Sequence, residues 1–115
     1  MHVQFAELPV RDQARAKRFY VENLGCEIAA DAPMVSDAWR WIELKFTGSE
    51  TTLHLIRAKD EDESDGLVLV DDDVAATVKG LRSRGVEILT ERHSPAWQPG
   101  RTVAEFRDSE GNRSR

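Results

Sequence analysis

Residues 10–28, VRDQARAKRFYVENLGCEI, decide the fold, because they recur sixty positions later as residues 70–88, VDDDVAATVKGLRSRGVEI. The matching positions are Val10 and Val70, Asp12 and Asp72, Gly25 and Gly85, Glu27 and Glu87, and Ile28 and Ile88. In each copy an aspartate suited to a helix N-cap precedes apolar residues at helical spacing, and a glycine suited to the left-handed conformation follows them. A repeat at a fixed period indicates two copies of one structural unit.

The residues around each copy predict the order strand, helix, strand, strand, strand. In the first copy we expect a helix between Asp12 and Gly25, a loop at 31–37, and strands at 3–10, 26–29, 39–46 and 51–56. In the second copy we expect a helix between the aspartates at 71–73 and Gly85, a loop at 90–100, a turn at 108–112, and strands at 67–70, 86–89, 101–107 and from 113 onward. Each copy is too small to close a core alone, so we expect the two to pack together.

Length and composition limit the class of protein. The 115 residues are enough for one domain, and 40% hydrophobic with 32% charged residues is typical of a globular protein. No apolar run approaches the ~20 residues that cross a bilayer, and we expect no secretory signal at the N-terminus. A net charge of −5 without a basic stripe argues against nucleic acid as a partner. The single cysteine, Cys26, cannot form an intrachain disulfide, which favours a cytoplasmic location.

An acidic segment separates the two copies. We expect one domain at 1–115, made of a first module at 1–58, a linker at 59–65 and a second module at 66–115. The charges of this segment are typical of a solvated linker. A cation-binding loop is the alternative, but the segment lacks the ligand ladder with a central glycine that a calcium loop has.

Alternation along the strands predicts two different faces. The residues expected to pack under the helices are Leu8, Val10, Ile42, Leu44, Leu53, Leu55 and Phe106. The residues expected to line a cleft are Phe5, Glu7, Trp39, Trp41, Glu43, His54 and Ile56, with Glu105 and Arg107 from the second copy. Aromatic rings with a few polar groups suit a small organic ligand. Trp97, in a proline-flanked loop, is a further candidate as a lid over that ligand.

Three of the cleft residues are candidates for chemistry. His54 could act as an acid or base, as histidine side chains commonly do, with Glu7 and Glu43 as its partners. The same three side chains are the candidates for an atypical metal site. The alternative is structural: a half-buried histidine held by hydrogen bonds, and glutamates that are solvated or paired with Lys45 or Arg40.

The sequence resembles the vicinal oxygen chelate superfamily, which includes glyoxalase I, fosfomycin- and bleomycin-resistance proteins and extradiol dioxygenases. The motifs that carry the resemblance are Leu8-x-Val10-x-Asp12, Phe19-Tyr20, Leu24-Gly25, Arg84-Gly85-Val86, the loop at 95–101 and the turn at 108–112. The resemblance implies an α+β fold of two tandem βαβββ modules. Their strands would form a curled mixed sheet around an open cleft, with one helix per module on the outside. It also implies a homodimer, since members often dimerise.

The resemblance also implies where metal ligands would stand, and this sequence does not supply them. The first-strand positions fall on Phe5 and on Asp65 or Gly66, and the last-strand positions fall on His54 and Arg115. A catalytic metal needs about three converging N or O ligands and an open position. We therefore expect no standard metal site and no cofactor.

These observations favour a protein that binds a small organic molecule in its cleft without chemistry. The residues expected to contact the ligand are Phe5, Trp39, Trp41, His54, Ile56, Trp97 and Glu105. The alternative is a glyoxalase-like lyase or isomerase with a divalent metal ion at the atypical site. A third interpretation is a subunit whose cleft binds nothing.

Overall fold

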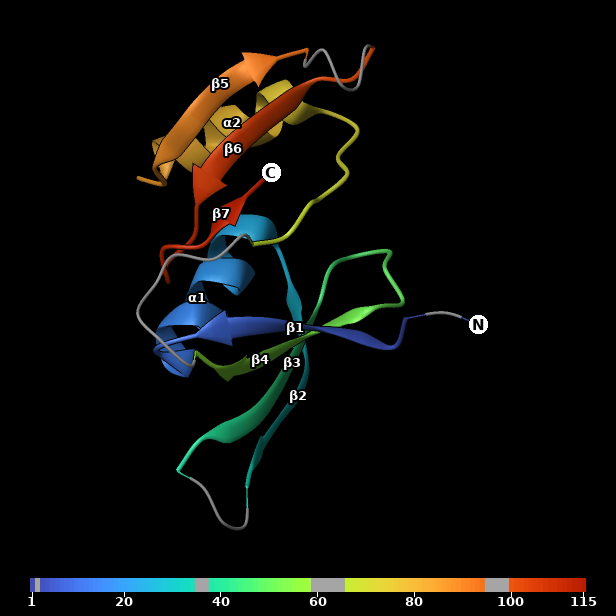
Figure 1. Ribbon diagram of the computed structural model, residues 1–115, viewed down its shortest axis with the longest axis vertical. Helices are drawn as coiled ribbons and strands as arrows, with labels where there is room; N and C mark the ends of the chain where they lie inside the picture. The colour runs from blue at the N-terminus through green and yellow to red at the C-terminus, as the bar shows by residue number, and fades with distance from the viewer. Residues whose placement is uncertain (2, 35–37, 59–65, 95–99) are drawn as a thin grey trace. The chain divides into compact units, whose positions relative to one another are not determined.

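The chain forms two compact units, Met1–Asp62 and Glu63–Arg115. The structure is a computed structural model that describes residues 1, 3–34, 38–58, 66–94 and 100–115. The first unit contains β1 (Phe5–Val10), α1 (Gln13–Leu24), β2 (Glu27–Pro33), β3 (Arg40–Lys45) and β4 (Thr52–Arg57). The second contains α2 (Val74–Ser83), β5 (Ile88–His93), β6 (Val103–Arg107) and β7 (Arg113–Ser114) (Figure 1). The boundary between the units falls in the acidic segment 59–65, which is outside the described residues.

The sheet of the first unit has the strand order β1-β4-β3-β2. β1 pairs in parallel with β4, and the other neighbours are antiparallel, so the sheet is mixed. The predicted hairpin of β3 and β4 is confirmed by the pairing of Glu43 with His54. Pro9 lies on β1 at the edge of the sheet, where its missing N–H is tolerated.

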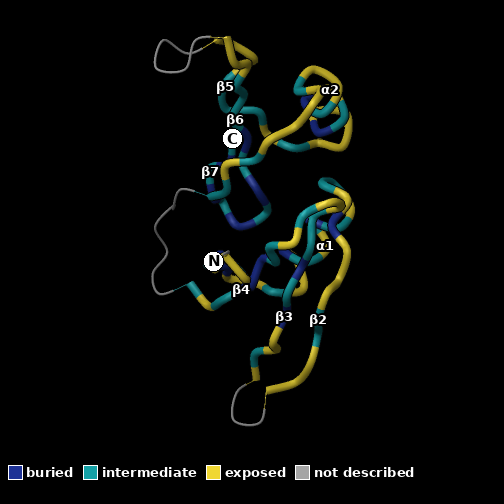
Figure 2. The backbone as a smooth tube through the Cα atoms, turned by 90° about the vertical axis from the view of Figure 1, so that its right-hand side faces the viewer, coloured by how far each residue is buried: buried dark blue, intermediate teal, exposed yellow. Residues whose placement is uncertain are grey.

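The helix of the first unit begins and ends where the sequence predicts. The Asp12 carboxylate accepts a hydrogen bond of 3.0 Å from the Arg15 amide, and Gly25 ends the helix with a φ of 69°. Ala16 and Tyr20 are the buried residues of α1. All the residues predicted to pack under the helices are buried: Leu8, Val10, Ile42, Leu44, Leu53, Leu55 and Phe106. Figure 2 shows these buried segments on β3 and β4, whereas β2 is largely exposed.

Two predicted loops begin too early. β2 continues to Pro33 because it stays paired with β3, with Ala32 opposite Trp41 and Pro33 opposite Arg40. β5 continues to His93, which pairs with Val103 of β6. Sequence alternation is weak in both extensions, so backbone pairing rather than side-chain pattern fixes their length.

The second unit repeats the capping pattern of the first. The Asp73 carboxylate accepts from the Ala76 amide at 3.0 Å, and Gly85 takes a φ of 83° one residue after the C-cap Arg84. Val78 and Leu81 of α2 are buried, as is Phe106 of β6. The strands β5, β6 and β7 form an antiparallel sheet in that order.

The prediction of a strand at 67–70 is wrong: the structure has no strand there, although two backbone hydrogen bonds join this segment to Arg115. The Arg115 amide donates to the Leu67 carbonyl and the Leu69 amide donates to the Arg115 carbonyl, which is a parallel pattern. The pairing is too brief to define a strand because β7 offers only Arg113 and Ser114. Gly66 lies beside this pair, where a β-carbon would be 2.4 Å from Ser114 Oγ.

Two further predictions concern single features. The turn at 108–112 is confirmed, since the Asp108 Oδ1 accepts from the amides of Glu110 and Asn112, each at 2.8 Å. Cys26 is buried, and burial raises the pKa of its thiol to about 11, so the thiol stays protonated near neutral pH. Neither α1 nor α2 is long and apolar enough to cross a membrane, and this holds for the described residues.

Candidate functional site

One face of the first unit's sheet collects the chemistry predicted for the cleft. Strand alternation turns Leu8, Leu44 and Leu55 toward α1, and it turns the residues between them to the opposite face. The register places Glu7 opposite His54, and His54 opposite Glu43. We call this group the aromatic face; its members are Phe5, Glu7, Trp41, Glu43, Thr52 and His54.

Three rings make contact on the aromatic face. The Trp41 and His54 ring centroids are 3.9 Å apart, with their planes inclined by 31°. Phe5 presents an edge to both rings, at 5.5 Å from His54 and 6.2 Å from Trp41. Such pairs add ~0.5–1.5 kcal/mol beyond the area they bury, so the rings support one another. Trp41 is 37% exposed, which leaves part of its indole available to a ligand.

Glu43 holds the indole of Trp41 through a hydrogen bond. Its Oε2 accepts a hydrogen bond of 2.9 Å from Trp41 Nε1, and its Oε1 accepts one of 2.6 Å from Thr52 Oγ1. The hydrogen bond from Thr52, followed by that from Trp41, lowers the pKa of the Glu43 carboxyl. Glu43 therefore stays ionised near neutral pH, with both oxygens already engaged.

His54 and Glu7 face each other without a hydrogen bond. His54 is buried, with 8% of its surface exposed, whereas the Glu7 side chain is 58% exposed. The distance from His54 Nδ1 to Glu7 Oε2 is 3.9 Å, which is too long for a hydrogen bond. Within the described residues His54 Nδ1 has no hydrogen-bond partner, and such a buried polar atom costs ~1–3 kcal/mol.

The donor set does not fit the metal that the family resemblance implies. Phe5 stands at a ligand position and packs its ring against His54, and Arg115 is a cation whose Nη1 lies 3.6 Å from Glu105 Oε1. Within the described part of the chain, no group of three or more His, Cys, Asp or Glu side chains is close enough to hold a metal ion. The described residues at these positions therefore do not form the metal site that the family resemblance implies.

Two more predicted ligand contacts lie near the ends of the same strands. The Arg57 guanidinium carbon lies 4.8 Å from the centre of the Trp39 ring, so Trp39 is engaged in a cation–π contact. Ile56 follows His54 on the same face of β4 and is half-buried, opposite Pro9 of β1.

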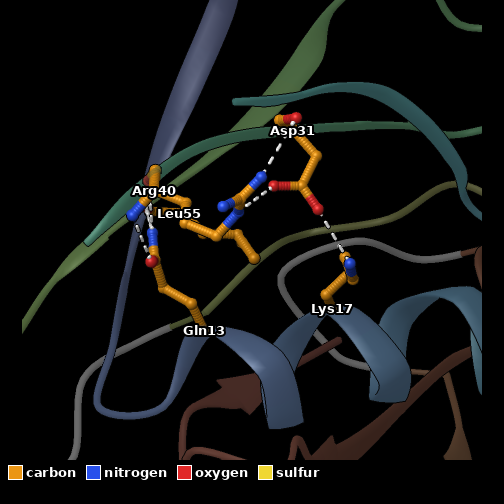
Figure 3. Close-up of polar contacts among 5 residues, drawn as sticks. All are labelled: Gln13, Lys17, Asp31, Arg40 and Leu55. Atoms are coloured by element: carbon orange, nitrogen blue, oxygen red, sulfur yellow. Dashed lines mark hydrogen bonds and ion pairs between the residues drawn. The ribbon is translucent and has the colours of Figure 1, made fainter. Parts of the chain in front are cut away.

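Gln13 of α1 contacts Arg40 at the start of β3 (Figure 3), and Trp41 is the next residue of that strand. The pairing of β3 with β4 covers Glu43, Leu44 and Lys45 in the described residues, so the start of β3 is not in that ladder. There the Gln13 amide nitrogen donates to the Arg40 carbonyl at 2.7 Å and to the Leu55 carbonyl at 3.2 Å. The Arg40 amide donates back to Gln13 Oε1 at 2.8 Å. The Gln13 side chain thus supplies hydrogen bonds to the backbone of β3 and β4 where these two strands are not paired with each other.

A cluster of three charged side chains, Lys17, Asp31 and Arg40, connects β2 to α1 and to the start of β3. The Asp31 carboxylate accepts from Lys17 Nζ at 2.8 Å and from Arg40 Nε at 2.6 Å. These hydrogen bonds, that from Lys17 first, lower the pKa of the Asp31 carboxyl. Asp31 therefore joins α1, β2 and β3 through charge.

The predicted site residues of the second unit lie on a charged face. Glu105 Oε2 lies 3.8 Å from Arg113 Nε, in addition to the contact with Arg115. Arg107 Nε lies 3.3 Å from Glu87 Oε2, and its Nη1 donates to the Gly111 carbonyl at 3.0 Å. Trp97 lies outside the described residues.

Sequence reasoning missed Thr52 and Gln13. Thr52 was detectable, since it precedes His54 by two positions on the same strand and so shares its face. Gln13 carries no such signal, because its role depends on where α1 meets a gap in strand pairing.

The architecture and the aromatic face together define the class of protein. In the part of the chain that the structure describes, two helices and mixed sheets in βαβββ-like units form an α+β fold of the glyoxalase type. Over residues 2–114 the chain matches the Glyoxalase/Bleomycin resistance protein/Dioxygenase superfamily, and it belongs to this family.

Particular relatives are similar over nearly the whole chain. An uncharacterized protein of Bacillus subtilis (strain 168), YetH, is 34% identical over 107 residues, which are 90% of this chain and 86% of YetH. TnmS3, an antibiotic binding protein from Streptomyces sp. CB03234, is 35% identical with a TM-score of 0.84, covering 99% of this chain and 92% of TnmS3. A superfamily member from Sphaerobacter thermophilus DSM 20745 is 26% identical with a TM-score of 0.83, covering 99% and 94% of the two chains.

Proposed function

We propose that this protein binds a small organic molecule with a planar aromatic part, at the aromatic face of its first unit, and does not transform it. The observation that carries the proposal is the cluster of Phe5, Trp41 and His54, with ring centroids 3.9–6.2 Å apart. Strand alternation puts these rings on the face opposite the buried leucines that pack toward α1. Flat, partly exposed rings next to a few fixed polar groups are what a site for such a ligand requires.

Two further lines support the proposal. TnmS3, 35% identical to this chain, is an antibiotic binding protein, so an antibiotic-like aromatic compound is a reasonable ligand class here. Both Glu43 oxygens are also engaged, by Trp41 and Thr52, which fits a carboxylate that positions the indole. No observation favours the alternative of a metal-dependent lyase.

The proposed contacts beyond the ring cluster are Trp39 and Ile56 of the first unit, and the contacts expected of Trp97 and Glu105 remain predictions from the sequence. A cytoplasmic location and a homodimer remain predictions from the sequence. Neither is needed for a ligand to contact the aromatic face.

Calorimetric titration with soluble planar aromatics of the quinoline and acridine classes tests the proposal. We expect saturable binding of about one molecule per chain, weakened at least ~10-fold by Trp41→Ala or Phe5→Ala. Ile28→Ala is the matched control, because Ile28 is an apolar residue on β2 that is 52% exposed. Absence of binding for every compound, or binding that ignores both ring substitutions, would contradict the proposal.

A further inference from the structure

We infer that the aromatic ligand carries a hydrogen-bond donor, a phenolic hydroxyl or an amine, which inserts between His54 and Glu7. This inference rests on the proposed function and specifies the ligand class at the same site. The observation behind it is separate from the ring cluster: it is the unsatisfied His54 Nδ1 and the carboxylate opposite it.

The geometry suits one bridging atom. His54 Nδ1 and Glu7 Oε2 are 3.9 Å apart, so an oxygen or nitrogen ~2.8 Å from each of them completes a triangle. A group in that position would satisfy the buried Nδ1, which has no other hydrogen-bond partner in the described residues. Phe5 and Trp41 flank the same imidazole, so a ring that contacts them brings its substituent close to this gap.

The two protein groups determine which substituents fit. A carboxylate only accepts hydrogen bonds, whereas an imidazole nitrogen donates or accepts according to its tautomer. A hydroxyl can donate to Glu7 and accept from His54, and an amine can donate to both. A carbonyl, an ether or a carboxylate offers Glu7 no proton, so these groups are disfavoured.

The site can open without breaking other polar contacts. The Glu7 side chain is 58% exposed, and within the described residues the ion pair with His54 is its one polar interaction. Rotation of Glu7 therefore disturbs no other polar contact of its side chain in this part of the chain, and the incoming hydroxyl or amine then hydrogen-bonds to both Glu7 and His54. Glu43, in contrast, is held by Trp41 and Thr52 and cannot serve in this way.

A matched pair of probes tests the inference. 6-Hydroxyquinoline and 6-methoxyquinoline have the same bicyclic ring, but only the first carries a hydroxyl donor. Calorimetry on the full chain should give a dissociation constant ~10-fold lower for the hydroxyl compound, the scale of one hydrogen bond to a charged group. In Glu7→Met and in His54→Phe this preference should fall to about twofold or less, while the methoxy compound still binds.

The outcomes separate the inference from the function on which it rests. Equal affinities in the unmodified protein would overturn the donor requirement but leave the aromatic site intact. A tenfold preference that persists in both variants would place the donor elsewhere and also overturn the inference. Binding of neither probe would contradict the proposed function itself. Glu22→Met, at an exposed position of α1, is the control substitution and should leave both affinities unchanged.

Discussion

The two units share a plan but differ in the face that their helices leave free. In the first unit this face carries the rings of Phe5, Trp41 and His54. In the second unit the strand residues are Glu105, Arg107 and Arg113. Glu105 pairs with Arg113, and Arg107 pairs with Glu87 and donates a hydrogen bond to the Gly111 carbonyl. Both units bury apolar side chains next to their helices, and the second also buries the polar turn residues Asp108, Glu110 and Asn112. The repeat thus preserves the helix caps and a core in each unit, whereas the ring cluster of the described residues lies in the first unit.

The core residues should respond alike in both units, and with the largest effects. Leu44 of β3 is 0% exposed and Leu81 of α2 is 1% exposed. We expect Leu44→Ala and Leu81→Ala each to lower the free energy of unfolding by about 2–5 kcal/mol, because each leaves a cavity under a helix. Urea denaturation followed by circular dichroism measures this. A loss below about 1 kcal/mol at either site would mean that the unit does not pack as described.

Substitutions on the aromatic face of the first unit and on the charged face of the second should affect ligand binding differently. Trp41→Ala should weaken binding of 6-methoxyquinoline about tenfold, because it removes a partly exposed ring from the cluster. Arg113→Ala should weaken the same binding by about twofold or less, since the ion pair of Arg113 with Glu105 adds little to contact with a neutral ring. Calorimetry compares the two variants directly. An Arg113 effect as large as that of Trp41 would remove the contrast between the units.

Gln13 should stabilise the start of β3, next to Trp41 of the aromatic face. Gln13→Ala removes two hydrogen bonds at Arg40 of β3 and one at Leu55 of β4, and we expect a loss of about 1 kcal/mol in stability. Amide hydrogen exchange at Arg40 should accelerate, because its amide donates to Gln13 Oε1. Gln4→Ala, at an exposed glutamine, is the control. Unchanged exchange at Arg40 would show that Gln13 does not hold the strand.

The smallest expected change in stability concerns the ion pairs of Asp31 with Lys17 and Arg40. The pKa of Asp31 is lowered in the fold, so its stabilisation is present above the unfolded-state pKa of about 4 and is lost as pH falls through the lower folded value. Asp31→Asn should therefore cost up to about 1 kcal/mol at pH 7. The difference from the unmodified protein should shrink as the pH is lowered below about 4. A difference independent of pH would assign Asp31 a role other than charge.

The sequence predicts the fold better than it predicts the site. Periodicity identifies the buried leucines, and the caps Asp12 and Gly25 mark α1, because these signals are local. The same alternation places Phe5, Trp41 and His54 on one face. It does not predict that Glu43 is bound by Thr52 or that Gln13 bridges two strands, since these contacts join segments whose distance depends on the finished sheet. The ends of β2 and β5 were missed for the same reason.

The central claim is that the aromatic face of the first unit is a ligand site. The most direct measurement is a two-dimensional ¹H–¹⁵N NMR titration of the labelled chain with 6-methoxyquinoline. We expect saturable shifts concentrated at Phe5, Thr52 and His54 and at the Trp41 indole N–H, which donates to Glu43. Shifts concentrated instead at Val103–Arg107, or no saturable shifts at all, would contradict the claim.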